Sequence, residues 1–186
     1  MKNYLEKYLD EEVYVDSERL KPGYEYNEEL AQAICESVCM IVVYSPRYER
    51  HEYCLREFTA MERIEEKRRA LLGEKGHGRR FIIPIVFGGN LNRLPARIKG
   101  SQHCSDFSRF TLASTDISRN PDFVTEIEKI CEVIYELYQA FDFRGQMLDA
   151  TIDCTAFPLP APNELAPWRA AVQAQRQPFP GREAIP

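Results

Sequence analysis

Hydrophobic residues in the first three quarters of the chain alternate between the spacing of strands and the spacing of helices. Two almost entirely apolar runs, at 39–45 and 81–87, predict strands that are buried on both faces, as in a parallel sheet. An alternating run at 11–17 predicts a further short strand, and 103–110 predicts a last one. Pro84 lies inside the second apolar run. Because proline has no N–H to donate, it predicts that this strand lies at an edge or contains a bulge.

Apolar residues at helical spacing predict helices between and around these strands. The expected helices cover 2–9, about 27–38 with Asn27 as the N-cap, about 50–72, and about 121–140. Strands that alternate with helices are typical of an α/β fold, in which helices flank both faces of a mainly parallel sheet.

Two loops of this fold are expected to face one crevice, because ligands of open parallel sheets bind at the carboxyl ends of the strands. One is ERLKPG at 18–23, in which Pro22-Gly23 is a strong turn signal. The other leads from Tyr44 into RHEYCLREF at 50–58. Spacing places Glu57 at the margin of the apolar face of its helix, where a carboxylate is partly desolvated and suited to chemistry. The alternative, which spacing alone favours, is an ordinary surface carboxylate.

Charge and hydropathy exclude some classes of protein. The formal net charge is −5 and the basic residues are scattered, which argues against a nucleic-acid partner. No apolar run approaches the roughly 20 residues of a membrane helix, and the charged N-terminus has no signal-peptide core. The sequence therefore predicts a cytoplasmic protein without a membrane partner.

The six cysteines are expected to be reduced thiols that pack as small hydrophobic residues, since disulfides are rare in the cytosol. No CxxC pair is present, so a zinc site is not predicted. A metal-binding group of Cys35, Cys39, Cys54 and His51 is a disfavoured alternative. No metal and no bound cofactor are expected.

The last part of the chain differs in composition. The predicted domain covers 1–145, and 146–186 is expected to be a tail or linker, since it contains more than half of the twelve prolines. A short helix over 168–175 is compatible with the sequence. Trp168 is expected either to remain in a solvated tail, which is favoured, or to dock on the domain or a partner.

Together, these motifs resemble the TIR domain, the Toll/interleukin-1 receptor fold, and most closely its bacterial branch. The strand VYVDS and the loop ERLKPG resemble the BB loop, in which Leu20, Pro22 and Gly23 would form an interaction surface. HEYCLRE resembles the Ser-x-Trp-Cys-x-x-Glu signature, with Tyr53 at the Trp position and Glu57 at the Glu position. The resemblance covers about 3–140 and implies a flavodoxin-like fold.

The chain departs from the family pattern at two places. His51 stands where the family has Ser, and the sequence is expected to begin within the first helix, without the family's central first strand. Three interpretations stay open: the domain is N-terminally truncated, the strand at 11–17 pairs directly with the strand at 39–45, or another chain fills the gap.

The resemblance implies that the protein cleaves the nicotinamide–ribose bond of NAD+, as a hydrolase or a cyclase, in signalling or bacterial defence. Glu57 would be the catalytic carboxylate, and NAD+ would be a substrate and not a cofactor. Arg19 and Lys21 would meet phosphates, or would be solvated charges. Tyr24 would cover a base, and Tyr53 would contact substrate, although packing is the alternative role of both tyrosines.

Two other functions remain open at this stage. The first is a non-catalytic interaction module that associates with other TIR domains through the BB loop. The second is a related Rossmann-like nucleoside transferase, against which the Pro-Gly loop argues. Glu57→Gln would distinguish the enzyme from the interaction module.

Overall fold

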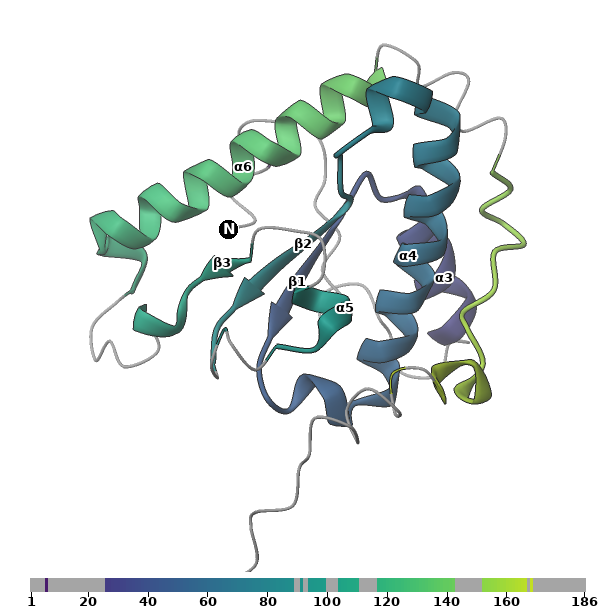
Figure 1. The fold of residues 1–186 in the computed structure, drawn as a ribbon, viewed down its shortest axis with the longest axis horizontal. Coiled ribbons are helices and arrows are strands. Elements are labelled where there is room, and N and C mark those ends of the chain that lie inside the picture. The colour runs from purple at the N-terminus through teal and green to yellow at the C-terminus, as the bar shows by residue number, and fades with distance from the viewer. Residues whose placement is uncertain are drawn as a thin grey trace, which may run out of the picture.

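The computed structural model describes residues 6, 26–88, 91, 94–99, 104–110, 117–142, 152–166 and 168. Its sheet contains β1 (Met40–Tyr44), β2 (Ile82–Val86) and β3 (Ser105–Asp106) in the order β1-β2-β3, and both pairings are parallel. This confirms the predicted α/β fold with a parallel sheet (Figure 1). The strand predicted at 11–17 lies outside the described residues. The strand predicted at 103–110 is much shorter than expected, because a 3-10 turn begins at Ser108.

In the described ranges, four α-helices with given bounds surround the sheet. They are α3 (Tyr26–Glu36), α4 (Glu52–Leu72), α5 (Ala96–Lys99) and α6 (Pro121–Asp142). Short 3-10 helices cover η1 (Tyr48–Arg50), η2 (Gly73–Gly76), η4 (Ser108–Phe110), η5 (Ile117–Arg119) and η6 (Pro162–Leu165). In the described part of the chain, no helix is both long enough and apolar enough to cross a bilayer.

The two faces of the sheet bury separate hydrophobic clusters, because side chains of a strand alternate between its faces. On one face, Val42 and Ile82 belong to the same cluster as Phe58, Met61 and Ile64 of α4. On the other face, Ile85 packs in a cluster whose remaining members come from the segment after β3 and from α6: Phe107, Phe110, Ile127, Ile130, Cys131 and Ile134. The sheet is therefore a layer between α3 and α4 on one side and α6 on the other (Figure 1).

Pro84 does not lie in an edge strand, which corrects one of the two sequence interpretations. It lies in the middle strand β2, opposite Val42 of β1. The Phe81 carbonyl accepts from the N–H of Met40. The backbone N–H and C=O groups of the odd-numbered residues of β2 therefore point toward β1 in the plane of the sheet, and the Pro84 nitrogen points toward β3. Pairing with β3 begins only at Ile85. Proline is tolerated because no described ladder bond requires its missing N–H.

The expectation of a solvated C-terminal tail is wrong for residues 152–168. Ile152, Leu159, Leu165 and Trp168 are buried, and all four belong to the cluster that contains the buried side chains of α4. In Figure 1 this segment runs along the side of α3 and α4 that faces away from the sheet. We call residues 152–168 the C-terminal segment. Most of the helix considered at 168–175 lies outside the described residues.

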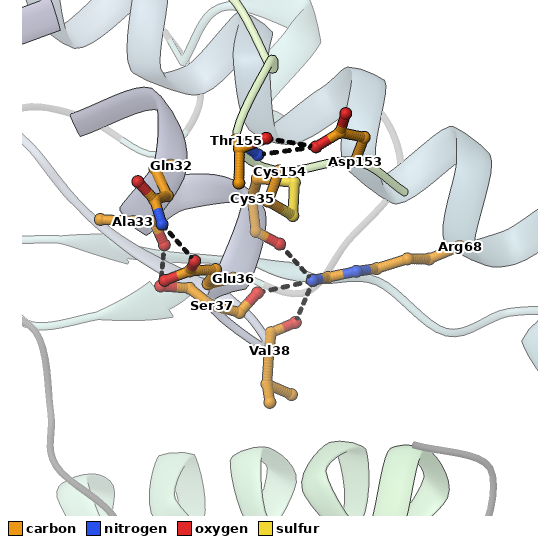
Figure 2. Close-up of a disulfide and its surroundings, with 10 residues drawn as sticks. All are labelled: Gln32, Ala33, Cys35, Glu36, Ser37, Val38, Arg68, Asp153, Cys154 and Thr155. Carbon is orange, nitrogen blue, oxygen red and sulfur yellow. Dashed lines mark hydrogen bonds between the residues drawn. A yellow bond between two sulfur atoms is a disulfide. The ribbon is translucent and has the colours of Figure 1, made fainter. Parts of the chain in front are cut away.

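The expectation that all six cysteines are reduced is also wrong. Cys35, in the last turn of α3, forms a disulfide with Cys154 of the C-terminal segment (Figure 2). The other four cysteines form no disulfide, and Cys131 is buried in the α6 cluster. The two cysteines of the bridge are separated by 119 positions, so neighbouring sequence gave no indication of the pairing.

Candidate active site

The candidate site lies where the chain leaves β1 and enters α4, at the carboxyl end of the strand. A turn closes directly after β1, because the Tyr48 N–H donates to the Ser45 carbonyl at 2.8 Å. The 3-10 helix η1 follows, and His51 is the N-cap residue of α4 in an extended conformation. This short connection places the first turns of α4, which carry Tyr53 and Glu57, beside the end of the strand.

Glu57 is half-buried and lies next to the fully buried Phe58 on α4. Met61, four residues further and therefore one turn away on the same side, is also fully buried. The carboxylate is thus held at the edge of the core and remains accessible from outside. This placement agrees with the helical spacing of the sequence.

Tyr48 lies in η1, directly before α4, and contributes a neutral hydroxyl group at the start of that helix. Its hydroxyl donates to the Cys54 carbonyl at 3.0 Å, which connects η1 to the first turn of α4. Burial raises the pKa of Tyr48 well above its ordinary value, and the ionised forms of Cys54 and Glu57 raise it further. The phenol therefore stays protonated at neutral pH, and the carboxylate lies close enough to act on it electrostatically.

Tyr44 extends this group of hydroxyl side chains to the last residue of β1. Its ring centroid lies 6.0 Å from that of Tyr48, and its hydroxyl donates to a carboxylate oxygen of Glu49. Burial, followed by the hydrogen bond to Glu49, raises the pKa of Tyr44. The sequence analysis did not identify Tyr44 or Tyr48 as site residues. The available signal was two tyrosines between the end of a predicted strand and the start of the next helix.

Tyr53, the predicted substrate-binding residue on α4, is 49% exposed. It lies four residues before Glu57, so both side chains project from the same side of the helix. The Arg56 guanidinium carbon lies 5.4 Å from the centre of the Tyr53 ring. The other predicted contacts lie outside the described residues: Arg19, Leu20, Lys21, Pro22, Gly23 and Tyr24.

The next turn of α4 is covered by the C-terminal segment. The Trp168 indole donates to the Thr59 hydroxyl at 3.2 Å and contacts the Phe58 ring edge-on, with centroids 5.0 Å apart. Arg97 of α5 lies over the indole and pairs with Glu62. Burial raises the pKa of Glu62, although the Arg97 charge opposes this shift.

A later carboxylate of α4 has a structural role. Glu65 is only 4% exposed, accepts the Phe81 N–H at 2.8 Å and pairs with Arg80 at 3.1 Å. The helix remains packed beyond this point, as buried Arg68 and Leu72 show. Burial of a glutamate on this helix is therefore not sufficient to identify a catalytic group.

Two clefts of about 470 Å³ each lie further along α4. One is lined mainly by charged side chains that include Glu62 and Arg69, and the other lies between Arg63 and Phe157. Glu57 lines neither of these two clefts. Within the described ranges, no group of three or more histidine, cysteine or acidic side chains could hold a metal ion.

Comparison with known proteins identifies one family. The sequence model of the family described as "TIR domain" matches residues 2–120. No curated protein and no solved structure matches the chain.

Proposed function

Because the chain belongs to the TIR domain family, some of whose members are NAD+-cleaving enzymes, we propose that it breaks the nicotinamide–ribose bond of NAD+. The observation that supports this proposal most strongly is the position of Glu57. It lies at the glutamate position of the family signature, is half-buried, and belongs to the second turn of α4, which follows the carboxyl end of β1 after a turn and η1. Parallel sheets bind their ligands at this end of the strands.

The chemistry requires one fixed negative charge. While it is bonded to the ribose, the nicotinamide ring is a cationic pyridinium. It leaves as a neutral molecule, so its departure needs no general acid. The charge that develops in the transition state is an oxocarbenium ion on the ribose, and the Glu57 carboxylate would stabilise it. Attack by water would give ADP-ribose, whereas attack by a nucleophile within the substrate would give a cyclic product.

Neighbouring side chains have proposed roles around this carboxylate. Tyr48, a protonated hydroxyl at the start of α4, would help to keep the carboxylate in place. Tyr53 would contact the substrate from the same side of α4. Arg19 and Lys21 would meet the phosphates and Tyr24 the base, as the resemblance implies, and Leu20, Pro22 and Gly23 would serve as the interaction loop.

A non-catalytic interaction module is the second candidate. TIR domains generally self-associate and act in signal transduction. Such association would suit a site that is completed by a second TIR domain as well as a domain that performs no chemistry. Partners in either case would be other TIR domains.

Nicotinamide release from NAD+ distinguishes the two functions when wild type is compared with Glu57→Gln and Glu66→Gln. Glu66 is an exposed glutamate on the same helix, so its variant makes the same chemical change away from the site. Catalysis by Glu57 predicts that only Glu57→Gln loses release. If wild type releases no nicotinamide but self-associates in sedimentation, the interaction module is supported.

A further inference from the structure

The C-terminal segment is attached to the domain by one covalent bond at its start. Cys154 lies two residues after the beginning of the segment, and its Cα is 5.4 Å from that of Cys35 on α3. Figure 2 shows the bridge above the end of α3, next to the guanidinium group of Arg68. Asp153 and Thr155, on either side of Cys154, bond to each other in a local turn and not to α3.

Beyond the bridge, a small number of noncovalent contacts hold the segment on α4. Trp168 and Leu165 are fully buried, and they lie at the far end of the segment from the disulfide. Arg56 donates to the Pro160 carbonyl at 2.7 Å, and Arg63 pairs with Glu164 at the surface. An exposed ion pair contributes little to stability. Docking of the segment therefore depends on the disulfide at one end and on the buried Leu165 and Trp168 at the other.

The two residues of the bridge differ in their exposure. Cys35 is 1% exposed, whereas Cys154 is half-buried. An external thiolate would therefore approach the bridge from the Cys154 side, and Cys35 would be the leaving group. Arg68 donates to the Cys35 carbonyl at 2.7 Å and so places a positive charge near that leaving group. A nearby cation favours departure of a thiolate.

The nearest cysteine in sequence is not suited to compete for this bridge. Cys39 lies four residues after Cys35, and burial raises the pKa of its thiol to about 12. Since only the thiolate attacks a disulfide, Cys39 is inactive in exchange at neutral pH. Exchange with an external reductant is therefore favoured over exchange with Cys39.

We propose that the Cys35–Cys154 disulfide is a thiol–disulfide exchange site that controls whether the C-terminal segment is docked on α3 and α4. Its reductant is a dithiol. One thiolate of the dithiol bonds to the Cys154 sulfur, the Cys35–Cys154 bond breaks, and Cys35 leaves with the electron pair and takes up a proton. The second thiol of the dithiol then displaces Cys154. The products are two cysteine thiols and an oxidised, disulfide-bonded dithiol.

Release of the segment would change the surface of the helix that carries the candidate site. Phe58 and Thr59, which contact Trp168 in the bridged form, would become exposed. Arg56 would lose its bond to Pro160. These residues lie on both sides of Glu57 in the sequence, but the exchange reaction itself does not depend on any catalytic role of that residue.

Trp168 reports directly on docking, because it is the only tryptophan in the chain. The experiment measures its fluorescence and its quenching by acrylamide in the full chain, before and after dithiothreitol. We expect a red shift of the emission and a severalfold rise in quenching on reduction, both reversed by glutathione disulfide. Far-UV circular dichroism should stay nearly unchanged, since the described part of the segment contributes no strand and only the short helix η6.

Two variants control the experiment. Cys154→Ser should resemble reduced wild type without any reductant. Cys104→Ser alters a cysteine outside the disulfide and should behave as wild type. If Cys154→Ser does not fold, reversible reduction of wild type decides the question alone. The proposal is overturned if peptide mapping of the unreduced protein finds no bridge. It is also overturned if reduction leaves Trp168 quenching unchanged, or if reduction unfolds the whole domain.

Discussion

Arg68 supplies the positive charge that the end of α3 lacks. The last turn of α3, all of it within the described residues, contains no basic side chain to offset its free carbonyl groups. The buried guanidinium of Arg68 reaches these carbonyls from α4. It donates to the carbonyls of Cys35, Ser37 and Val38 at 2.6 to 3.0 Å (Figure 2). One side chain thus joins α3 to α4 beside the disulfide.

Replacing this side chain should destabilise the domain. Arg68→Met would leave buried carbonyl groups without a donor, and we expect the free energy of unfolding to fall by about 3 kcal/mol. Arg68→Lys keeps the charge but not the planar set of donors, so its loss should be smaller. Urea titrations of both variants measure the difference. Equal stability of Arg68→Met and wild type would contradict this role of the guanidinium.

Glu62 should make stability depend on pH. Burial raises its pKa in the folded state above the ordinary glutamate value of 4.5, so the folded protein binds a proton more tightly than the unfolded chain does. The stabilisation that this group contributes is fully present below the ordinary pKa of 4.5, and it is lost as the pH rises through the raised pKa of the folded state. Urea midpoints of Glu62→Gln relative to wild type should therefore increase as the pH is raised from below 4.5 toward 7. A difference that stays constant over this range would show that the group is not perturbed.

At the same scale, sequence spacing predicted the environment of Glu57 but not that of Glu65. The margin position of Glu57 depends on its own helix, whose periodicity is visible in the sequence. The burial of Glu65 depends on the Phe81 N–H and on Arg80, which lie outside that helix. Local periodicity contains no information about such partners.

Among the elements, α6 forms a core of its own on the second face of the sheet. Ile134 is buried against this face, whereas its neighbour Val133 is 48% exposed. Ile134→Ala should lower the free energy of unfolding by about 3 kcal/mol through lost burial and a cavity. Val133→Ala should change it by less than about 0.5 kcal/mol. Similar effects in urea titrations of the two variants would contradict this orientation of α6.

The sequence predicted β1, β2 and the long helices α3, α4 and α6 because each contains its own hydrophobic pattern. It did not predict the central position of β2. Whether a strand tolerates Pro84 depends on which side of the strand its nitrogen faces and on where the neighbouring strand β3 begins. Both facts are properties of the assembled sheet and are absent from the β2 sequence.

On the scale of the whole molecule, the C-terminal segment joins the domain through contacts between residues more than one hundred positions apart. Cys35 meets Cys154, and Thr59 meets Trp168. Proline-rich composition correctly indicates that such a segment cannot form a core by itself. It does not indicate whether a finished domain offers the segment a surface, and for this reason the solvated-tail expectation failed.

Trp168 should be the main noncovalent anchor of this segment. In the disulfide-bonded protein, Trp168→Ala removes a buried indole, its bond to Thr59 and its contact with Phe58, and should destabilise by about 3 kcal/mol. Trp168→Phe keeps part of the ring contact and should lose less. Thermal unfolding followed by circular dichroism compares them. No difference between Trp168→Ala and wild type would indicate that the segment contributes nothing beyond its covalent bond.

The central claim is that this TIR domain cleaves NAD+ and that Glu57 carries the reaction. The most direct test is the turnover number for nicotinamide release by Glu57→Gln, divided by that of Glu66→Gln in the same assay. The account predicts a ratio lower than about one hundredth, as is usual when a preorganised transition-state charge is removed. A ratio near one would contradict it, because the reaction would then proceed without the Glu57 carboxylate.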